Sequence, residues 1–226
     1  MVILATATFV TCFDNNALWS EISRLTLGAE SRWAISAAFF AILVGSLNVF
    51  LAVTALHRSM KLVLIVVLML SAMIGFFMSE YKILVDTSMI QSILDTDRRE
   101  VRDLVTLSLL RHVGLFGIAP SILIALVPLG PATWGRELSY RAGFVAASLV
   151  ALVSVLYLSY QDMSVFTQRN RHVRMMINPG YPVYALVQNL RLTGPLAGKE
   201  DKDLAPAAAR LPPASDEKKV LFVLVV

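Results

Sequence analysis

Residues 62–78 read LVLIVVLMLSAMIGFFM, and residues 81–103, which follow Ser79 and Glu80, read YKILVDTSMIQSILDTDRREVRD. The first stretch carries no charge and approaches the ~20 apolar residues that a membrane-spanning helix needs. The second is the longest polar interruption of a mostly apolar chain, and it holds the densest set of groups able to bind a ligand. Together they predict a membrane helix that leads into a functional loop.

The composition of the whole chain is that of a polytopic membrane protein. Of 226 residues, 57% are hydrophobic and 16% charged, with a mean hydropathy of +0.68; a soluble domain is about 45–50% apolar and about 25% charged. The net charge of +4 does not predict binding to nucleic acid, because basic residues near the ends of membrane helices are expected from topology. The single cysteine, Cys12, cannot form an internal disulfide.

The apolar runs predict five membrane spans. They cover residues 1–13, 34–56, 62–78, 113–129 and 143–160. The first run is short, so we expect a helix whose beginning is missing. Asn48, inside the second, is expected to hydrogen-bond a neighbouring helix, and Pro120 is expected to kink the fourth. The basic connections 57–61 and 130–141, compared with the net negative loop 80–103, put the basic turns in the cytoplasm and the loop outside.

The rest of the chain has a different character. The membrane domain is predicted to end at residue 160, and residues 161–193 to form an amphipathic bridging segment that is broken at Asn178-Pro179-Gly180. Residues 194–218 are rich in proline and alanine and predict a linker. Residues 219–226, KVLFVLVV, are typical of a buried parallel strand. Because a strand needs a sheet, we expect a second, α/β domain to begin there.

The polar loop is expected to contain a helix. Ser88 and Gln91 fit a capping box, which predicts that this helix begins at Ser88. If it continues, Ser92, Thr96 and Glu100 share one face; a break after Asp95 is the alternative. The apolar residues would lie on the opposite side: Ile90, Ile93 and Leu94.

The residue types in this loop suit a zwitterionic headgroup. A carboxylate can pair with an ammonium group, while a hydroxyl and helix N-terminal amides can bind a phosphate. A solvated acidic surface has the same pattern, so the residues alone leave both interpretations open. The sequence has no Walker loop, HExxH, CxxC or nucleophile elbow. His57, His112 and His172 each lie beside an arginine and look like residues at membrane boundaries, not metal ligands.

Four separate stretches carry a resemblance to a known family. Residues 81–100 resemble the outer loop of the bacterial phosphoethanolamine–lipid A transferases, which include the mobile colistin-resistance enzymes. Residues 13–19, FDNNALW, are similar to the end of that family's first helix, and residues 171–179, RHVRMMINP, to the segment after its fifth. Residues 219–226 are similar to the first strand of its catalytic domain.

The resemblance implies an all-α, five-helix membrane domain with periplasmic loop helices and an amphipathic bridging helix. This domain would be joined to a periplasmic α/β domain of alkaline-phosphatase/sulfatase type. In the family, a zinc-bound threonine takes phosphoethanolamine from phosphatidylethanolamine and passes it to lipid A. The nucleophile and the zinc ligands are expected beyond Val226, so no catalytic residue or metal ligand is expected here, and this part alone should be inactive. The implied location is the bacterial inner membrane, with the C-terminal part in the periplasm.

The implied partners are phosphatidylethanolamine, lipid A, the bilayer and the catalytic domain. Thr96 and Glu100 match family positions that contact the phosphoethanolamine headgroup. Ser92 falls where many members have asparagine and keeps a short hydrogen-bonding group. Two alternatives stay open: a transferase that modifies another glycan or glycolipid, and a non-enzymatic membrane anchor, channel or transporter.

Overall fold

The computed structural model describes residues 1–27, 32–54, 59–95, 104–128 and 134–193. The chain divides into two units, Met1–Leu186 and Val187–Val226, and of the second only the end of one helix, residues 187–193, is described. Every regular element within the described ranges is a helix, as the composition predicted. The predicted linker 194–218 and strand 219–226 lie outside the described residues.

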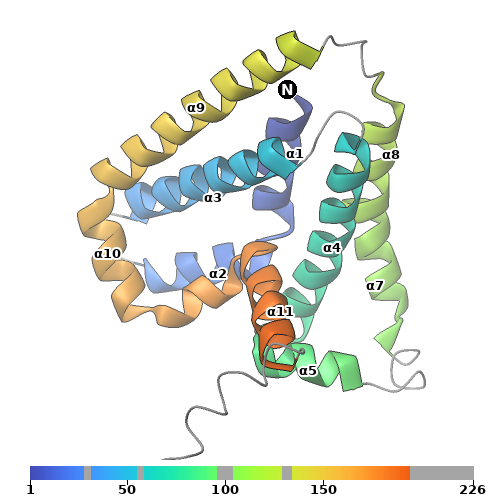
Figure 1. The fold of residues 1–226 in the computed structure, drawn as a ribbon. Coiled ribbons are helices and arrows are strands. Elements are labelled where there is room, and N and C mark those ends of the chain that lie inside the picture. Colours follow the sequence, from blue (N-terminus) through green and yellow to red (C-terminus); the bar gives the residue numbers. More distant parts are fainter. Residues whose placement is uncertain (28–31, 55–58, 96–103, 129–133, 194–226) are drawn as a thin grey trace, which may run out of the picture. The chain divides into compact units, whose positions relative to one another are not determined.

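Figure 1 shows how the helices follow one another along the chain. They are α1 (Val2–Phe13), α2 (Asn16–Leu25), α3 (Arg32–Thr54), α4 (Met60–Glu80), α5 (Thr87–Asp95), α7 (Leu107–His112), the π-helical η1 (Val113–Ile118), α8 (Ala119–Leu126), α9 (Trp134–Leu158), α10 (Tyr160–Arg169), the 3₁₀-helical η2 (Arg171–Met176) and α11 (Gly180–Thr193).

Each of the five predicted spans is helical over most of its described residues. Among the described residues, three helices are long and apolar enough to cross a membrane by themselves: α3, α4 and the continuous helix Leu107–Leu126. A fourth candidate is the pair Ala142–Leu158 and Tyr160–Arg169, which is bent by 73°, and α1 is a shorter apolar helix. Several boundaries differ from the prediction by a few residues, and two differ by more. The fourth span begins earlier because the Thr106 hydroxyl caps it, and α9 already begins at Trp134, within the predicted connection.

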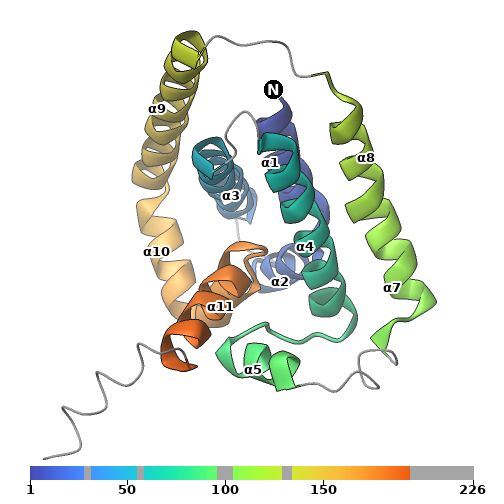
Figure 2. The ribbon, with the colours of Figure 1, turned by 45° about the vertical axis from the view of Figure 1, so that its right-hand side comes forward.

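The long helices pack side by side. α3 contacts both α1 and α9, and α4 contacts α1, η1 and α8, so Figure 2 shows the order α9, α3, α1, α4, α8. Asn48 confirms the prediction made for it, because its amide donates to the Ser148 hydroxyl of α9 at 2.9 Å. Pro120 lies in the first turn of α8, directly after the π-helical segment. A proline cannot donate the hydrogen bond of an α-helix, and a π-helical turn accommodates such an interruption.

A hydrophobic core joins α2 and α3 to the segment after the last span. Leu18, Ile22, Phe39, Phe166 and Val173 are buried together. Beside them, Glu21 accepts two hydrogen bonds from Arg24, at 2.6 and 2.8 Å, and contacts His172 at 2.8 Å. The Arg24 hydrogen bond is the main cause that lowers the pKa of Glu21 to about 2, against an opposing effect of burial. The contact between His172 and Glu21 links η2 to α2 beside the buried apolar core.

Candidate functional site

The helix α5 begins one residue earlier than the capping box predicted, and its cap is a different residue. Asp86 Oδ1 accepts the backbone N–H of Met89 at 2.8 Å and the hydroxyl of Ser88 at 2.7 Å. The Asp86 carbonyl accepts the N–H of Ile90 at 3.0 Å. The prediction that Ser88 caps this helix is therefore wrong. The bond from the Met89 N–H is the leading cause that lowers the pKa of Asp86, so the cap is anionic.

The site residues expected from the sequence are only partly described. Ser92 lies in the second turn of α5, where it is exposed, and its hydroxyl donates to the Ser88 carbonyl at 3.1 Å. Thr96 and Glu100 lie outside the described residues, so the structure does not test whether the three share one face.

An apolar contact fixes the base of α5 to the end of α4. Val85, just before the helix, is buried with Met78 of α4 and Ala17 of α2, and Ile90 of α5 packs against the same cluster. Figures 1 and 2 show α5 running crosswise at the end of α4. The two helices are separated by only a few residues, of which Lys82 has a positive φ of 55°. The described part of the polar loop, residues 81–95, is thus held against the span that precedes it.

A buried polar cluster lies beside these elements, and no role was assigned to it from the sequence. Asn15 donates through Nδ2 to the carbonyls of Val10 and Asn178, at 3.0 and 2.9 Å. In return, its Oδ1 accepts the backbone N–H of Asn178 at 2.9 Å. The side-chain Nδ2 of Asn178 donates to the carbonyls of Asp14 and Ser71, at 2.9 and 2.7 Å. One side chain therefore ties together α1, α4 and the segment before α11.

Two further features define this cluster. Gly75 of α4 leaves room for the chain: a Cβ there would lie 2.6 Å from the Asp14 carbonyl oxygen, far inside van der Waals contact. The Asp14 carboxylate, directly after α1, is 2% exposed, and neither oxygen accepts a hydrogen bond from the described residues. Burial raises its pKa to about 7, because a charged carboxylate loses its hydration there.

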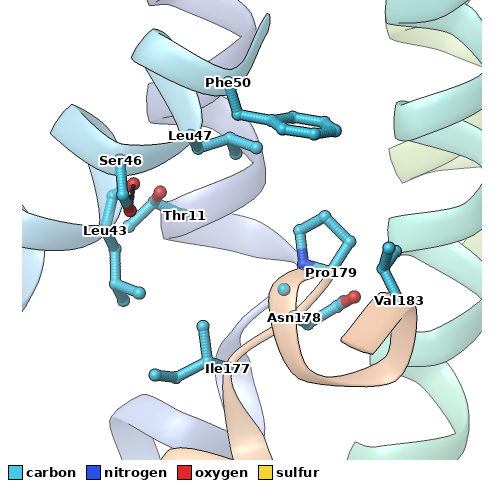
Figure 3. Close-up of a pocket in the computed structure, with 10 residues that line it drawn as sticks. Thr11, Leu43, Ser46, Leu47, Phe50, Ile177, Asn178, Pro179 and Val183 are labelled. Atoms are coloured by element: carbon cyan, nitrogen blue, oxygen red, sulfur yellow. Dashed lines mark hydrogen bonds between the residues drawn. The ribbon is translucent and has the colours of Figure 1, made fainter. Parts of the chain in front are cut away.

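Cavities flank the cluster. One of about 260 Å³ is lined by α1, α3 and the start of α11; Figure 3 shows Phe50 and Leu47 of α3 on one side and Ile177 and Pro179 on the other. A larger one, of about 370 Å³, is formed by α4, α5, residues 104–109 and the first turns of α11. Within the described ranges, no three His, Cys, Asp or Glu side chains are grouped to hold a metal ion.

The sequence itself identifies the family. The model of the family described as phosphoethanolamine transferase EptA/EptB matches residues 43–193, which is more than half of the chain. The chain belongs to this family. The match to the transferases includes α4, α5 and the segment up to α11, and so contains both the polar loop and Asn178.

Individual relatives agree. The chain is 26% identical over 187 residues to phosphatidylethanolamine transferase Mcr-1 of Escherichia coli, which is 82% of this chain and 34% of Mcr-1. It is 32% identical over 144 residues to Mcr-2 of Escherichia coli, which is 63% of this chain and 27% of Mcr-2. The chain thus spans about a third of the length of these relatives. The lipooligosaccharide phosphoethanolamine transferase EptA of Neisseria meningitidis has the same fold, with a TM-score of 0.76 at 20% identity over 93% of this chain and 37% of that one.

The fold of the described part is that of the transferases' N-terminal membrane domain. Sequence reasoning found the polar loop by its composition, but it missed the cluster around Asn178. The available signals were Asp14 and Asn15, which interrupt an apolar run, and Asn178 before a proline. Each looked like an ordinary helix end, and only the fold brings them together.

Proposed function

We propose that the chain is the membrane part of an enzyme that moves phosphoethanolamine from phosphatidylethanolamine to a phosphate of lipid A. The observation that carries this proposal is the family match over residues 43–193, because it includes the whole polar loop. The names of Mcr-1 and Mcr-2 as phosphatidylethanolamine transferases support the donor. The acceptor follows from the resemblance to the lipid A-modifying members.

In this proposal the loop after α4 binds the donor headgroup. The Glu100 carboxylate pairs with the ammonium group, and the Thr96 and Ser92 hydroxyls donate to phosphate oxygens. The geometry of α5 supports the assignment at one residue, since the Ser92 hydroxyl is exposed on a helix that is held at the end of a membrane span. The net charge of the loop favours an orientation in which it faces the periplasm.

The chemical step belongs to groups other than those described. The resemblance implies zinc in the complete enzyme, but the described residues contain no ligand set for it, and we assign none. Residues 1–226 alone are proposed to bind the donor lipid without transferring its headgroup.

The test is a charge-neutralising substitution in the complete enzyme. Glu100→Ala should reduce the phosphoethanolamine found on lipid A by at least about tenfold, because an ammonium left without its carboxylate loses a charge-assisted contact of about 1.5–3 kcal/mol. Mass spectrometry of lipid A from bacteria that produce each variant measures this. Glu80→Ala is the matched control, since Glu80 is an exposed acid at the end of α4 and should keep wild-type modification.

Unchanged lipid A modification in Glu100→Ala, at equal protein abundance, would contradict the site. Phosphoethanolamine on another glycan or glycolipid, with none on lipid A, would keep the transferase and replace the acceptor.

A further inference from the structure

The larger cavity lies directly under the helix that carries Ser92. From α5 it is lined by Met89, Ile90 and Ile93, whereas the exposed Ser88 and Ser92 do not line it and point about a third of a turn away from the lining residues that follow them. The helix therefore separates a polar surface from a cavity of about 370 Å³. A molecule with one polar and one apolar end can contact both sides of α5.

The cavity is continuous with an exposed apolar stripe of α4, a candidate membrane span. On α4, exposed apolar side chains recur about once per turn at Leu62, Val66, Leu70 and Met73, which forms one stripe along the span. The last two of these, Leu70 and Met73, also line the cavity, and Phe77, one turn further on, belongs to its wall. A hydrocarbon chain can therefore pass from the bilayer into the cavity along α4 without meeting a polar group.

The lining excludes a peptide as the natural occupant. Every side chain of the wall is apolar, including those contributed by Val105, Leu109, Pro182 and Val183. A peptide backbone buried here would find no side-chain partners for its N–H and C=O groups, at a large cost. An acyl chain has no such groups, so it can contact the apolar wall without leaving a polar group unpaired.

We propose that this cavity receives one acyl chain of the donor phospholipid while the headgroup lies on the polar side of α5. This inference rests on the proposed function, which assigns the headgroup to the loop that α5 begins. An acyl chain gains little by exchanging lipid neighbours for leucine and methionine, since both surroundings are equally apolar. The cavity therefore adds little to the affinity for the lipid. Its effect is to position the acyl chain, and so to fix how deep in the membrane the phosphate of the headgroup lies.

The test is photolabelling of the 226-residue chain in phosphatidylglycerol vesicles. The probe is phosphatidylethanolamine with a diazirine near the end of one acyl chain, and the labelled residues are located by peptide mass spectrometry. Met89→Trp and Met73→Trp place an indole in the cavity from two different walls. Each should lower labelling of residues 83–93 roughly tenfold, because a packed cavity does not accept additional groups.

Leu115→Trp is the matched control, because Leu115 is exposed on a span and does not line the cavity. It should leave the labelling of residues 83–93 unchanged. Helical circular dichroism and thermal unfolding show whether each variant is folded, and if Met89→Trp is not, Met73→Trp decides. Unchanged labelling in a folded cavity variant would overturn the inference, and so would labelling by chain-tagged lipid A in place of the phospholipid.

The same probe with a choline headgroup separates this inference from the proposed function. If both hold, phosphatidylethanolamine labels more strongly, and Glu100→Ala removes the difference. Equal labelling by the two headgroups, still blocked by the tryptophans, would contradict the proposed function and support the acyl-chain site. Preference for ethanolamine without an effect of either tryptophan would overturn the cavity inference alone.

Discussion

Two regions packed against the second half of α4 are built in opposite ways. Around Asn15 and Asn178, buried amides join segments that are 163 residues apart in the chain. Around α5, the polar bonds that fix the helix are local, such as Ser92 to Ser88, and the wider contacts are apolar. Directional bonds hold one geometry, whereas apolar contacts tolerate rearrangement. The first region therefore fixes the scaffold, and the second can adjust to a ligand.

The strongest test of this contrast is Asn178→Ala. It leaves the buried Asp14 carbonyl without its side-chain donor and leaves the Ser71 carbonyl, inside α4, with its helical bond alone. An unsatisfied buried carbonyl costs about 1–3 kcal/mol and the lost second bond to Ser71 about 0.5–1.5 kcal/mol, so the free energy of unfolding should fall by about 2–4 kcal/mol. Thermal unfolding of the purified chain in detergent measures this.

Asn170→Ala is the control for that substitution. Asn170 is only partly buried, and its side chain makes a local bond to the Phe166 carbonyl at 3.0 Å. Its loss should cost no more than about 1 kcal/mol. Equal destabilisation of both variants would show that the buried cluster around Asn178 contributes no more to stability than a local hydrogen bond.

Asp14 gives the scaffold a pH dependence of a defined sign. Its pKa is about 7 in the folded chain and ordinarily 3.8, so the folded state holds the proton more tightly. The contribution of Asp14 to the free energy of unfolding is therefore greatest below about pH 4, where the carboxyl is protonated in both states. This contribution is lost as the pH rises through about 7 and the folded state must release the proton. Between about pH 5 and pH 8 the unfolding free energy should fall by about 2–3 kcal/mol.

Asp14→Asn should remove most of this slope and raise the midpoint of thermal unfolding at pH 8. The measurement is a series of unfolding curves from pH 5 to pH 8 for both proteins. A wild-type midpoint that does not change over this range would show that the carboxylate has a polar partner and is not isolated.

Gly75→Ala tests the close approach of α4 to Asp14. The added methyl group would lie 2.6 Å from a backbone oxygen, so the helices must separate, which typically costs about 1–3 kcal/mol. Gly114→Ala is the matched control, because a Cβ there meets nothing within 4 Å. That variant should be neutral or slightly stabilised, since alanine favours a helix over glycine. Equal unfolding midpoints for the two variants would remove the close approach as a constraint.

The sequence predicted those parts of the fold that depend on local composition. The longer helical spans follow from apolar runs near bilayer length, the short α1 follows from a shorter apolar run, and the Asn48 bond follows from the cost of a lone amide in an apolar helix. The cap of α5 was misassigned because Asp86 and Ser88 are both good capping residues. Burial of Val85 against Met78 holds the chain so that the aspartate, and not the serine, precedes the first turn.

The buried cluster could not be predicted for a different reason. Asn15 and Asn178 are typical of helix ends wherever they occur, and local pattern gives no sign that two such residues will meet. Gly75 looks like an ordinary small residue of a membrane helix, until the Asp14 carbonyl is found against it. The cavity under α5 likewise combines segments from α4 to α11, each of which is merely apolar by itself.

The smallest expected effect on stability is that of Ser92→Ala. It contrasts most clearly with the effect of Asn178→Ala in the buried cluster. Ser92→Ala should change the unfolding free energy by less than about 0.5 kcal/mol, because the residue is exposed and its described bond is local. In the complete enzyme it should weaken use of phosphatidylethanolamine only a few-fold, the equivalent of one hydrogen bond of about 0.5–1.5 kcal/mol. Ser92→Asn should keep or improve activity, because the resemblance implies an asparagine amide at this position and the amide can also donate to a phosphate oxygen. Transfer rates with vesicle-bound donor, set beside thermal unfolding, separate these effects. A large loss of stability in Ser92→Ala would show that α5 belongs to the fixed scaffold, and would contradict the contrast between α5 and the cluster around Asn178.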